Sequence, residues 1–400
     1  MSVIQLAITL VTSAGVSFRA VSKIFIHLNL CLRLNIGMPT HTTVLNWTKK
    51  QGVASFREPA FYQREKWVLI ADESIQFGNK KMLLVLAVPE LRCSQGKALR
   101  YNDTTPLILK VGASWKSEDI ASEISRHIDL SQISYCIADT GSNLTRAFKS
   151  LKCKYITDIN HKFSLMIQST LKNDRLFIDY TKALSDIRAQ KSLSKIARIV
   201  PPNQRVMSRF MNLTPLFEWG KKMIFLLNTE ELTQEEKKTL SFLEPMKEFV
   251  FDTCHLLNQL KKTQQLLKNE GFSKITAKEA VSMFSNLKSD HSLKIRKQLG
   301  EYFADLSSKS DGKTVCCSSD IIESCFGKYK EMVKGNKSVG ISDLSFCIAA
   351  MMGRNSCDKT KESMETVSMK KLKELKTKNI SKTLFAEKME LNKIMERSYS

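Results

Sequence analysis

The sequence predicts an α/β protein of the α+β kind, with one mixed sheet, a large all-helical insertion and two short helices in front. Short apolar runs that suit buried strands lie between residues 67 and 159. Residues 165–315 then carry apolar side chains at spacings of three and four, which is typical of helices. The 400 residues are 42% hydrophobic, which is enough for more than one structural unit.

Residues 1–52 predict a small helical DNA-binding domain, and residues 53–66 a linker. Ser17 is a suitable N-cap for a helix over residues 18–28, and a turn leads into a second helix over residues 41–50. Two helices joined by a turn, the second rich in Thr, Asn and Lys, are similar to a helix-turn-helix. The side chains that we expect to face a DNA groove are Thr43, Asn46, Lys49 and Lys50.

Residues 67–164 predict the first part of a catalytic core. Three strands are followed by a helix that Ser117 is expected to cap, and then a strand, a helix and a last strand alternate. This order, in which the first and fourth strands are neighbours, is that of a ribonuclease-H-like core. The expected strands cover residues 67–72, 82–89, 106–112, 133–139 and 154–159.

The predicted core is interrupted by the helical insertion and resumes afterwards. We expect the insertion over residues 165–315 and the second part of the core over residues 316–353. That second part begins with an acidic helix and ends with an apolar helix over residues 339–352. Residues 354–400 form a basic, charged tail, which we interpret as a solvated helix or a mobile arm.

The charge points to a polyanionic partner. Sixty-two Lys and Arg residues against 40 Asp and Glu residues give a net charge of +22. DNA is the first choice of partner and an anionic membrane surface the second. Residues 1–57 contain no acidic residue, and between residues 182 and 209 seven basic residues face one acid, Asp186. We expect this second run to follow DNA phosphates through Arg188, Lys191 and Lys195.

Cysteine usage and hydropathy predict a protein of a reducing, aqueous compartment. The ten cysteines form no CxxC pair, so their spacing does not suit a zinc site, and several lie within apolar runs. The N-terminus lacks the basic region of a signal peptide, and no segment has 18 apolar residues in a row. We expect the cytoplasm or nucleoid in a bacterium, or the nucleus in a eukaryote.

Two aspartates end apolar strands and are candidate metal ligands. Asp72 ends the first strand and Asp139 the fourth, and two such carboxylates on neighbouring strands could hold Mg²⁺ or Mn²⁺ for phosphodiester cleavage. Each could instead be an ordinary strand-end turn residue. Asp158 competes with Asp139 because it also follows an apolar run. Glu73 adjoins Asp72 but should point to the other face of the strand.

Glu323 is the candidate third carboxylate. It lies in the first turn of the acidic helix, where a glutamate is commonly only a favourable partner of the helix dipole. Its neighbours favour a functional role, because Ile321 and Ile322 indicate burial beside it and the basic residues Lys328 and Lys330 follow it. These two lysines could hold the phosphates that flank a scissile bond.

Three motifs resemble the DDE transposases, especially those of the hAT type. They are the turn Asp139-Thr-Gly-Ser-Asn, the segment Tyr155-Ile-Thr-Asp-Ile-Asn-His-Lys-Phe-Ser-Leu-Met and the acidic helix Asp320-Ile-Ile-Glu-Ser-Cys-Phe-Gly-Lys-Tyr-Lys. The resemblance covers residues 67–352. It implies a ribonuclease-H-like fold, two Mg²⁺ or Mn²⁺ ions, cleavage of transposon ends, strand transfer into target DNA and at least a dimer, with no membrane partner. Asp72, Asp139 and Glu323 are then the metal-binding, catalytic residues.

Two features of the sequence leave alternatives open. The family pattern has a cysteine shortly before His161, where this chain has Asp158, so His161 either contacts DNA or the active centre or packs against the insertion. Trp219 could stack on a base, although a core position is the commoner role of such a residue. A catalytically inactive, domesticated DNA-binding protein and another ribonuclease-H-like nuclease are the alternative functions; the helical insertion and the N-terminal helices argue against the second.

Overall fold

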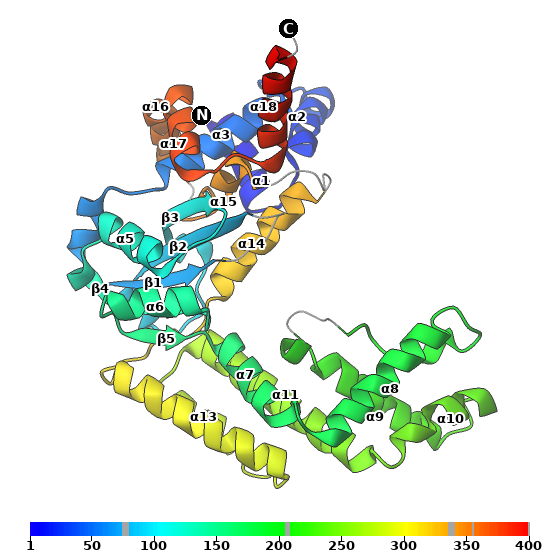
Figure 1. Ribbon diagram of the computed structural model, residues 1–400. Coiled ribbons are helices and arrows are strands. Elements are labelled where there is room, and N and C mark those ends of the chain that lie inside the picture. Colours follow the sequence, from blue (N-terminus) through cyan, green and yellow to red (C-terminus); the bar gives the residue numbers. More distant parts are fainter. Residues whose placement is uncertain (74–79, 205–208, 335–340, 354–355, 399–400) are drawn as a thin grey trace. The chain divides into compact units, whose positions relative to one another are not determined.

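The computed structural model of the chain describes five stretches, which are residues 1–73, 80–204, 209–334, 341–353 and 356–398 (Figure 1). Over these ranges the structure is mixed α/β, 64% helical, with one five-stranded sheet. The chain divides into two compact units. We call residues 1–95, 99–156 and 319–400 the sheet unit, and residues 96–98 and 157–318 the helical unit.

The sheet unit contains the sheet and the helices from both ends of the chain. Its first part runs through α1 (Ser2–Thr12), α2 (Phe18–Leu32), α3 (His41–Ala54), β1 (Trp67–Asp72), β2 (Lys81–Pro89), α4 (Glu90–Cys93), β3 (Thr105–Gly112), α5 (Ser117–His127), β4 (Ile133–Ala138), α6 (Ser142–Ser150) and β5 (Tyr155–Thr157), whose last residue opens the helical unit. Its second part runs through α14 (Asp320–Val333), α15 (Phe346–Ala349), α16 (Cys357–Thr366), α17 (Met369–Asn379) and α18 (Leu384–Ser398).

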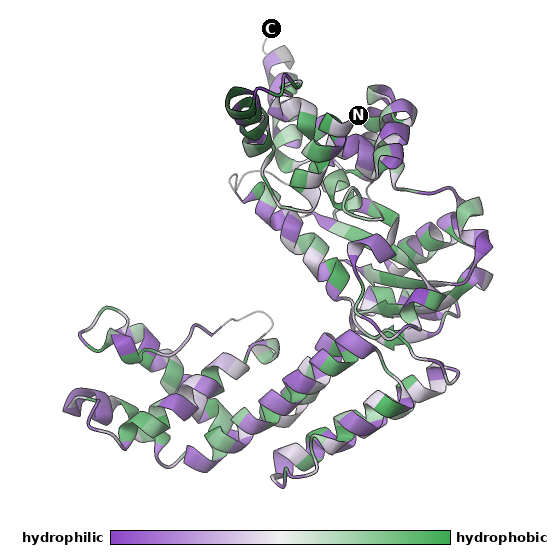
Figure 2. Ribbon diagram, turned by 180° about the vertical axis from the view of Figure 1, so that it is seen from behind, coloured by the Kyte–Doolittle hydropathy of each residue, from purple (hydrophilic) through white to green (hydrophobic). Residues whose placement is uncertain are grey.

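The strands follow the order β3-β2-β1-β4-β5. β2 pairs with both β1 and β3 in the antiparallel sense, whereas β1 and β4 are parallel. β1 and β2 are central strands, so both of their faces are covered and their sequences are apolar along nearly their whole length. Figure 2 shows this dominance of hydrophobic residues along the strands. The predicted adjacency of the first and fourth strands is confirmed.

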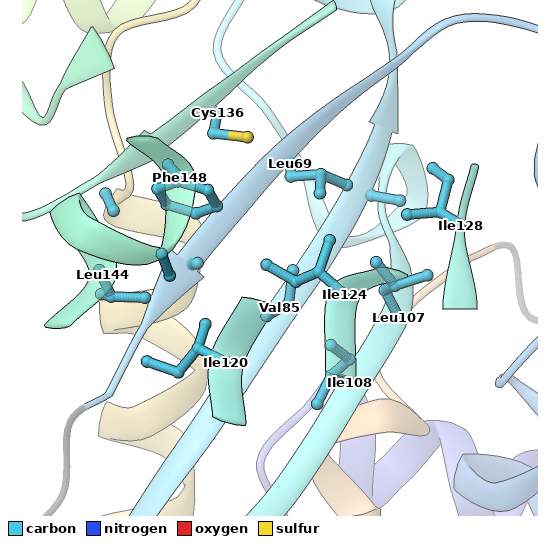
Figure 3. Close-up of a cluster of buried hydrophobic side chains, with 14 of the residues drawn as sticks. Leu69, Val85, Leu107, Ile108, Ile120, Ile124, Ile128, Cys136, Leu144 and Phe148 are labelled. Carbon is cyan, nitrogen blue, oxygen red and sulfur yellow. The ribbon is translucent and has the colours of Figure 1, made fainter. Parts of the chain in front are cut away.

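One face of the sheet is covered by α5 and α6. A cluster of buried side chains joins these two helices to alternate residues of the strands (Figure 3). From β1 the cluster takes Leu69 and Ala71, and from β4 it takes Cys136 and Ala138. α14 contacts β1, and α15 contacts β3. The sheet therefore lies between helices from two distant parts of the chain.

The N-terminal helices pack with helices from the C-terminal part. Val21 and Phe25 of α2 and Val44 of α3 form a small core with residues of α1. As predicted, the Ser17 hydroxyl caps α2, because it accepts a hydrogen bond from the backbone N–H of Ala20. α3 also contacts α15, α16 and α17. The expected separate helical domain is thus part of the sheet unit.

The helical unit has its own core of aromatic side chains. Tyr180 and Phe217 lie with ring centroids 4.9 Å apart, and Phe249 meets Phe217 edge-on at 5.8 Å. In the described part of the chain, none of the helices is long and apolar enough to cross a bilayer. The helices of this unit are α7 (Ile159–Leu171), α8 (Arg175–Lys191), α9 (Thr214–Leu227), α10 (Gln234–Leu240), α11 (Lys247–Glu270), α12 (Lys274–Ser282) and α13 (Asp290–Lys309).

Candidate active site

The parallel pairing of β1 and β4 brings two aspartates to the same end of the sheet. The register places Ala71 of β1 opposite Ala138 of β4. Asp72 is the last residue of β1, and Asp139 directly follows β4. Because parallel strands present their carboxyl ends at one end of the sheet, the backbones of these two residues are neighbours. We call this the carboxylate end of the sheet.

Strand alternation also fixes the face on which Asp72 lies. Leu69 and Ala71 point into the cluster under α5 and α6, so Asp72 points to the other face. Asp139 lies one residue beyond β4, and the turn that leads into α6 holds its carboxylate. β1 is contacted by α14, a helix that contributes no residue to this cluster. Asp72 therefore shares a face with α14, the helix that carries Glu323.

Asp139 is held by the turn that follows it. The backbone N–H of Gly141 donates to Asp139 Oδ1 at 2.8 Å, and the hydroxyl of Tyr155 donates to the backbone oxygen of Asp139. A Cβ atom on residue 141 would lie 2.7 Å from the same carboxylate oxygen. A side chain at residue 141 would therefore displace the Asp139 carboxylate from its present position.

Glu73 is a further carboxylate at this end of the sheet, and it is not among the residues predicted for the site. Burial raises the pKa of Glu73 above its ordinary value, and the negative charge of Asp139 raises it further. The positive charge of Lys81 and a hydrogen bond with Asn143 lower this pKa in part. Its Oε2 atom is buried, without a hydrogen-bond partner among the described residues. As strand alternation predicts, the Glu73 side chain points away from the Asp72 face, toward α6. Only the fold shows that Asn143 and Asp139 lie near it.

Glu323 lies in the first turn of α14, the helix that contacts β1. The helix is anchored by the buried side chains of Ile322, Phe326 and Tyr329, while Glu323 itself is exposed in the first turn. Next to it, the hydroxyl groups of Ser324 and Tyr101 lie 2.6 Å apart and join α14 to the loop before β3. Glu323 is thus presented to solvent by a rigid helix that packs on β1.

Asp158 has a local structural role. It is fully buried, and its Oδ1 accepts a hydrogen bond of 3.0 Å from the backbone N–H of His161, which makes it the N-cap of α7. His161 is half-buried in the same turn. Both residues belong to the helical unit. Of the two candidates for the second aspartate, Asp139 is the one that lies in register with Asp72.

The carboxylates at this end of the sheet have the donor chemistry that a divalent cation requires. Their donor atoms are carboxylate oxygens, which Mg²⁺ and Mn²⁺ prefer. The nearest strand cysteine, Cys136, points into the cluster on the other face. A buried carboxylate oxygen without a hydrogen-bond partner, such as Glu73 Oε2 beside Asp139, is a position that a bound cation would stabilise.

The prediction that Lys49 faces a DNA groove is wrong. Its side chain is only 10% exposed, and its ammonium lies 2.9 Å from the carboxylate of Asp343. The other predicted groove residues, Thr43, Asn46 and Lys50, are half-buried. α3 is contacted by helices α1, α2, α15, α16 and α17, whereas a recognition helix must leave one face open to a groove. The structure shows α3 as an internal helix of the sheet unit.

The basic run between residues 182 and 209 is partly engaged within the helical unit. The Arg188 guanidinium donates to the backbone oxygen of Pro201 at 2.7 Å, and Lys191 lies 3.5 Å from Glu235. Lys195 is exposed. Arg205 lies outside the described residues, and so does the side chain of Arg209. These engaged residues favour a structural role over the predicted contact with phosphates.

The two lysines predicted beside Glu323 differ in their surroundings. The Lys328 ammonium donates to the backbone oxygen of Thr12 at 3.0 Å and lies 4.6 Å from the centre of the Tyr101 ring. Lys330 is exposed. Lys328 therefore ties α14 to α1, and only Lys330 is presented to solvent. Trp219, considered above for base stacking, is 9% exposed and belongs to the core of the helical unit.

No protein-family model matches the chain, and no curated protein matches it either. A function is therefore inferred from the geometry of the carboxylate end.

Proposed function

We propose that the chain is a DDE-type DNA transposase that cleaves DNA with divalent metals at Asp72, Asp139 and Glu323 and transfers the freed strand into target DNA. One observation carries the proposal. β1 and β4 pair in parallel, so Asp72 and Asp139 lie at the same end of adjacent strands, and α14 contacts β1. Paired carboxylates on a rigid sheet are what two-metal phosphodiester chemistry requires.

The topology supports a ribonuclease-H-like interpretation of the sheet. The order β3-β2-β1-β4-β5, with β2 antiparallel to its neighbours, is compatible with such a sheet. The helical unit then separates the strands from α14 in the sequence, over residues 157–318. A helical insertion before the third acidic residue is also part of the resemblance to hAT-type transposases.

Each residue of the site has a distinct task in the proposed reaction. Two Mg²⁺ or Mn²⁺ ions, when bound, supply an activated water and neutralise the leaving oxygen. Asp72 and Asp139 would hold them from the sheet, and Glu323 from α14. The Gly141 N–H keeps one lobe of the Asp139 carboxylate oriented. The reaction needs no covalent protein intermediate, so the buried cysteines have no part in it.

Metal-dependent nicking of supercoiled plasmid DNA tests the proposal. With Mg²⁺ or Mn²⁺ present, Asp72→Asn, Asp139→Asn and Glu323→Gln are each expected to lower the nicking rate by about 100-fold or more, because each removes a metal-binding oxygen. Nicking at the parental rate by all three variants contradicts the proposal.

Two further variants serve as matched controls. Asp129 is an exposed aspartate before β4, at the opposite end of the sheet, and Asp129→Asn should leave nicking unchanged. Asp158→Asn should also retain nicking, because asparagine is as good an N-cap as aspartate. Loss of nicking in Asp158→Asn together with full activity in Asp139→Asn would exchange the roles of the two aspartates.

A further inference from the structure

The most basic helix of the sheet unit is α17. Its eleven residues contain five lysines and one glutamate. Leu372 is its buried residue, and the helix contacts α3 and β3 through this side. All five lysines are exposed. Figure 2 shows hydrophilic colouring along this helix and its neighbour α16. The basic tail that the sequence predicts is therefore an ordered, docked helix in this part.

The C-terminal end of α17 is attached to the sheet near the carboxylate end. Ile380 forms a bridge with Val111 of β3, and the backbone N–H of Ser381 donates to the Val111 oxygen at 3.1 Å. Val111 lies at the carboxyl end of β3, which pairs with the amino end of β2. That end of β2 lies beside Asp72, which is opposite Leu84. α17 thus ends at the same end of the sheet as the two aspartates.

The lysines of α17 are poorly neutralised by the protein. Lys376 lies 3.8 Å from Asp343, a carboxylate that is already paired with Lys49 at 2.9 Å. No carboxylate in the described part of the chain forms an ion pair with the outer lysines, Lys370, Lys371, Lys373 and Lys378. A concentration of unpaired cations around the exposed side of one helix attracts a polyanion.

We propose that the outer face of α17 binds the phosphodiester backbone of duplex DNA and leads it to the carboxylate end of the sheet. This inference rests on the proposed function and gives it a docking surface. The outer lysines span residues 370–378, or about 12 Å of helix, which is long enough for several phosphates at about 1.7 Å per charge along the duplex axis. In this proposal α17 takes the DNA-binding role that the sequence predicts for α3, a helix that α17 partly covers.

Nucleic acid fits this face better than a membrane does. A helix that lies in a bilayer interface buries a broad apolar side with Trp, Phe or Leu. On α17 the apolar side chain of Leu372 is instead packed against the protein, and the exposed large hydrophobic residue is Met369, at its first position. The exposed side of α17 is thus charged, and the helix has no broad apolar side that could enter a lipid bilayer.

Equilibrium binding of the full chain to a labelled DNA duplex, in EDTA and at increasing salt, tests the inference. Lys371→Gln/Lys373→Gln/Lys378→Gln is expected to reduce the slope of log affinity against log salt by about 0.9 for each phosphate that is no longer neutralised, or about 2.7 for three phosphates. The corresponding triple arginine variant should keep the parental slope, because it keeps the charge. Circular dichroism of each variant checks that the helices remain.

The matched control neutralises three exposed lysines at the opposite end of the sheet, Lys149, Lys152 and Lys154. Its slope should equal that of the parent. A parental slope for the α17 glutamine variant overturns the inference, and so does an equal reduction of the slope in the control. Binding of the parent to phosphatidylserine vesicles but not to the duplex also overturns it.

Failure of the inference and failure of the proposed function are distinguishable. The binding assay contains no metal, so it does not depend on cleavage. If Asp72→Asn and Asp139→Asn nick DNA normally while the α17 variant binds DNA more weakly, the catalytic proposal is wrong and the docking surface stands. If those aspartates are essential and the α17 variant binds like the parent, the inference alone is wrong.

Discussion

Glu236 shows how one buried carboxylate can organise a turn of the helical unit. Both of its oxygens accept hydrogen bonds from Arg198, at 2.7 and 2.8 Å, and Oε2 also accepts from the backbone N–H of Thr233 at 2.8 Å. Thr233 and Glu236 form a capping box at the start of α10. These hydrogen bonds, first those from Arg198, lower the pKa of Glu236 from 4.5 to about 2.

The pH dependence of stability follows from this lowered pKa. A carboxyl group whose pKa is lower in the folded state stabilises the fold above its unfolded pKa, and this contribution is lost as the pH falls through the folded value. We expect Glu236→Gln to lower the thermal midpoint at pH 7. The difference from the parent should shrink between pH 4.5 and about 2. Thermal unfolding across this range measures it, and a difference that stays constant with pH would refute the assignment.

At the scale of residues, the sequence predicts what depends on local pattern. Asp72 and Asp139 can be identified because each directly follows an apolar strand or ends one. The partner of Lys49 cannot, because Asp343 lies 294 residues away in the chain. The sequence does not predict that Glu73 belongs to the site for the same reason, because the residues around it come from α6 and β2.

Helix packing at α3 depends on one glycine. A Cβ atom at Gly52 would lie 1.9 Å from the backbone oxygen of Phe346, so α3 and α15 approach each other more closely than any side chain allows. The buried Thr48, Gln51 and Val53 surround this contact on α3. The contact joins the N-terminal helices to the segment that follows α14.

Gly52→Ala is therefore expected to destabilise the protein by about 3 kcal/mol or more, because the obstructing atom belongs to the backbone of α15. The matched control is Gly300→Ala in α13, where no atom lies within 4 Å of the added Cβ. It should stabilise the helix by about 0.5–1 kcal/mol. Denaturant unfolding measures both free energies, and equal effects at the two sites would disprove the packing argument.

At the scale of elements, the long apolar and periodic segments are predictable and the C-terminal ones are not. The strands and α5 follow their hydrophobic patterns closely. The helix predicted over residues 339–352 is wrong in its described part, which has a 3-10 turn (Asp343–Ser345) and the four-residue α15; residues 339–340 lie outside the described ranges. Tertiary contacts with α3 and β3 determine this segment and α17, and no local pattern encodes them.

The whole molecule consists of a sheet unit that is interrupted in sequence by a helical unit. The sheet unit joins residues 1–95 and 99–156 to residues 319–400, and each unit has its own buried core. The sequence predicts an insertion over residues 165–315, and the helical unit covers residues 157–318. Its boundaries shift because α7 begins directly after β5, where Asp158 caps it. The aspartates of the proposed site belong to one unit.

Binding of Mn²⁺ to the full chain, followed by electron paramagnetic resonance of the free ion, tests the central claim most directly. It asks whether Asp72 and Asp139 bind metal, independently of DNA and of cleavage. We predict that the parent and Asp129→Asn bind with the same affinity, and that Asp72→Asn and Asp139→Asn bind at least about tenfold more weakly. Equal Mn²⁺ affinity in all four proteins would contradict the account.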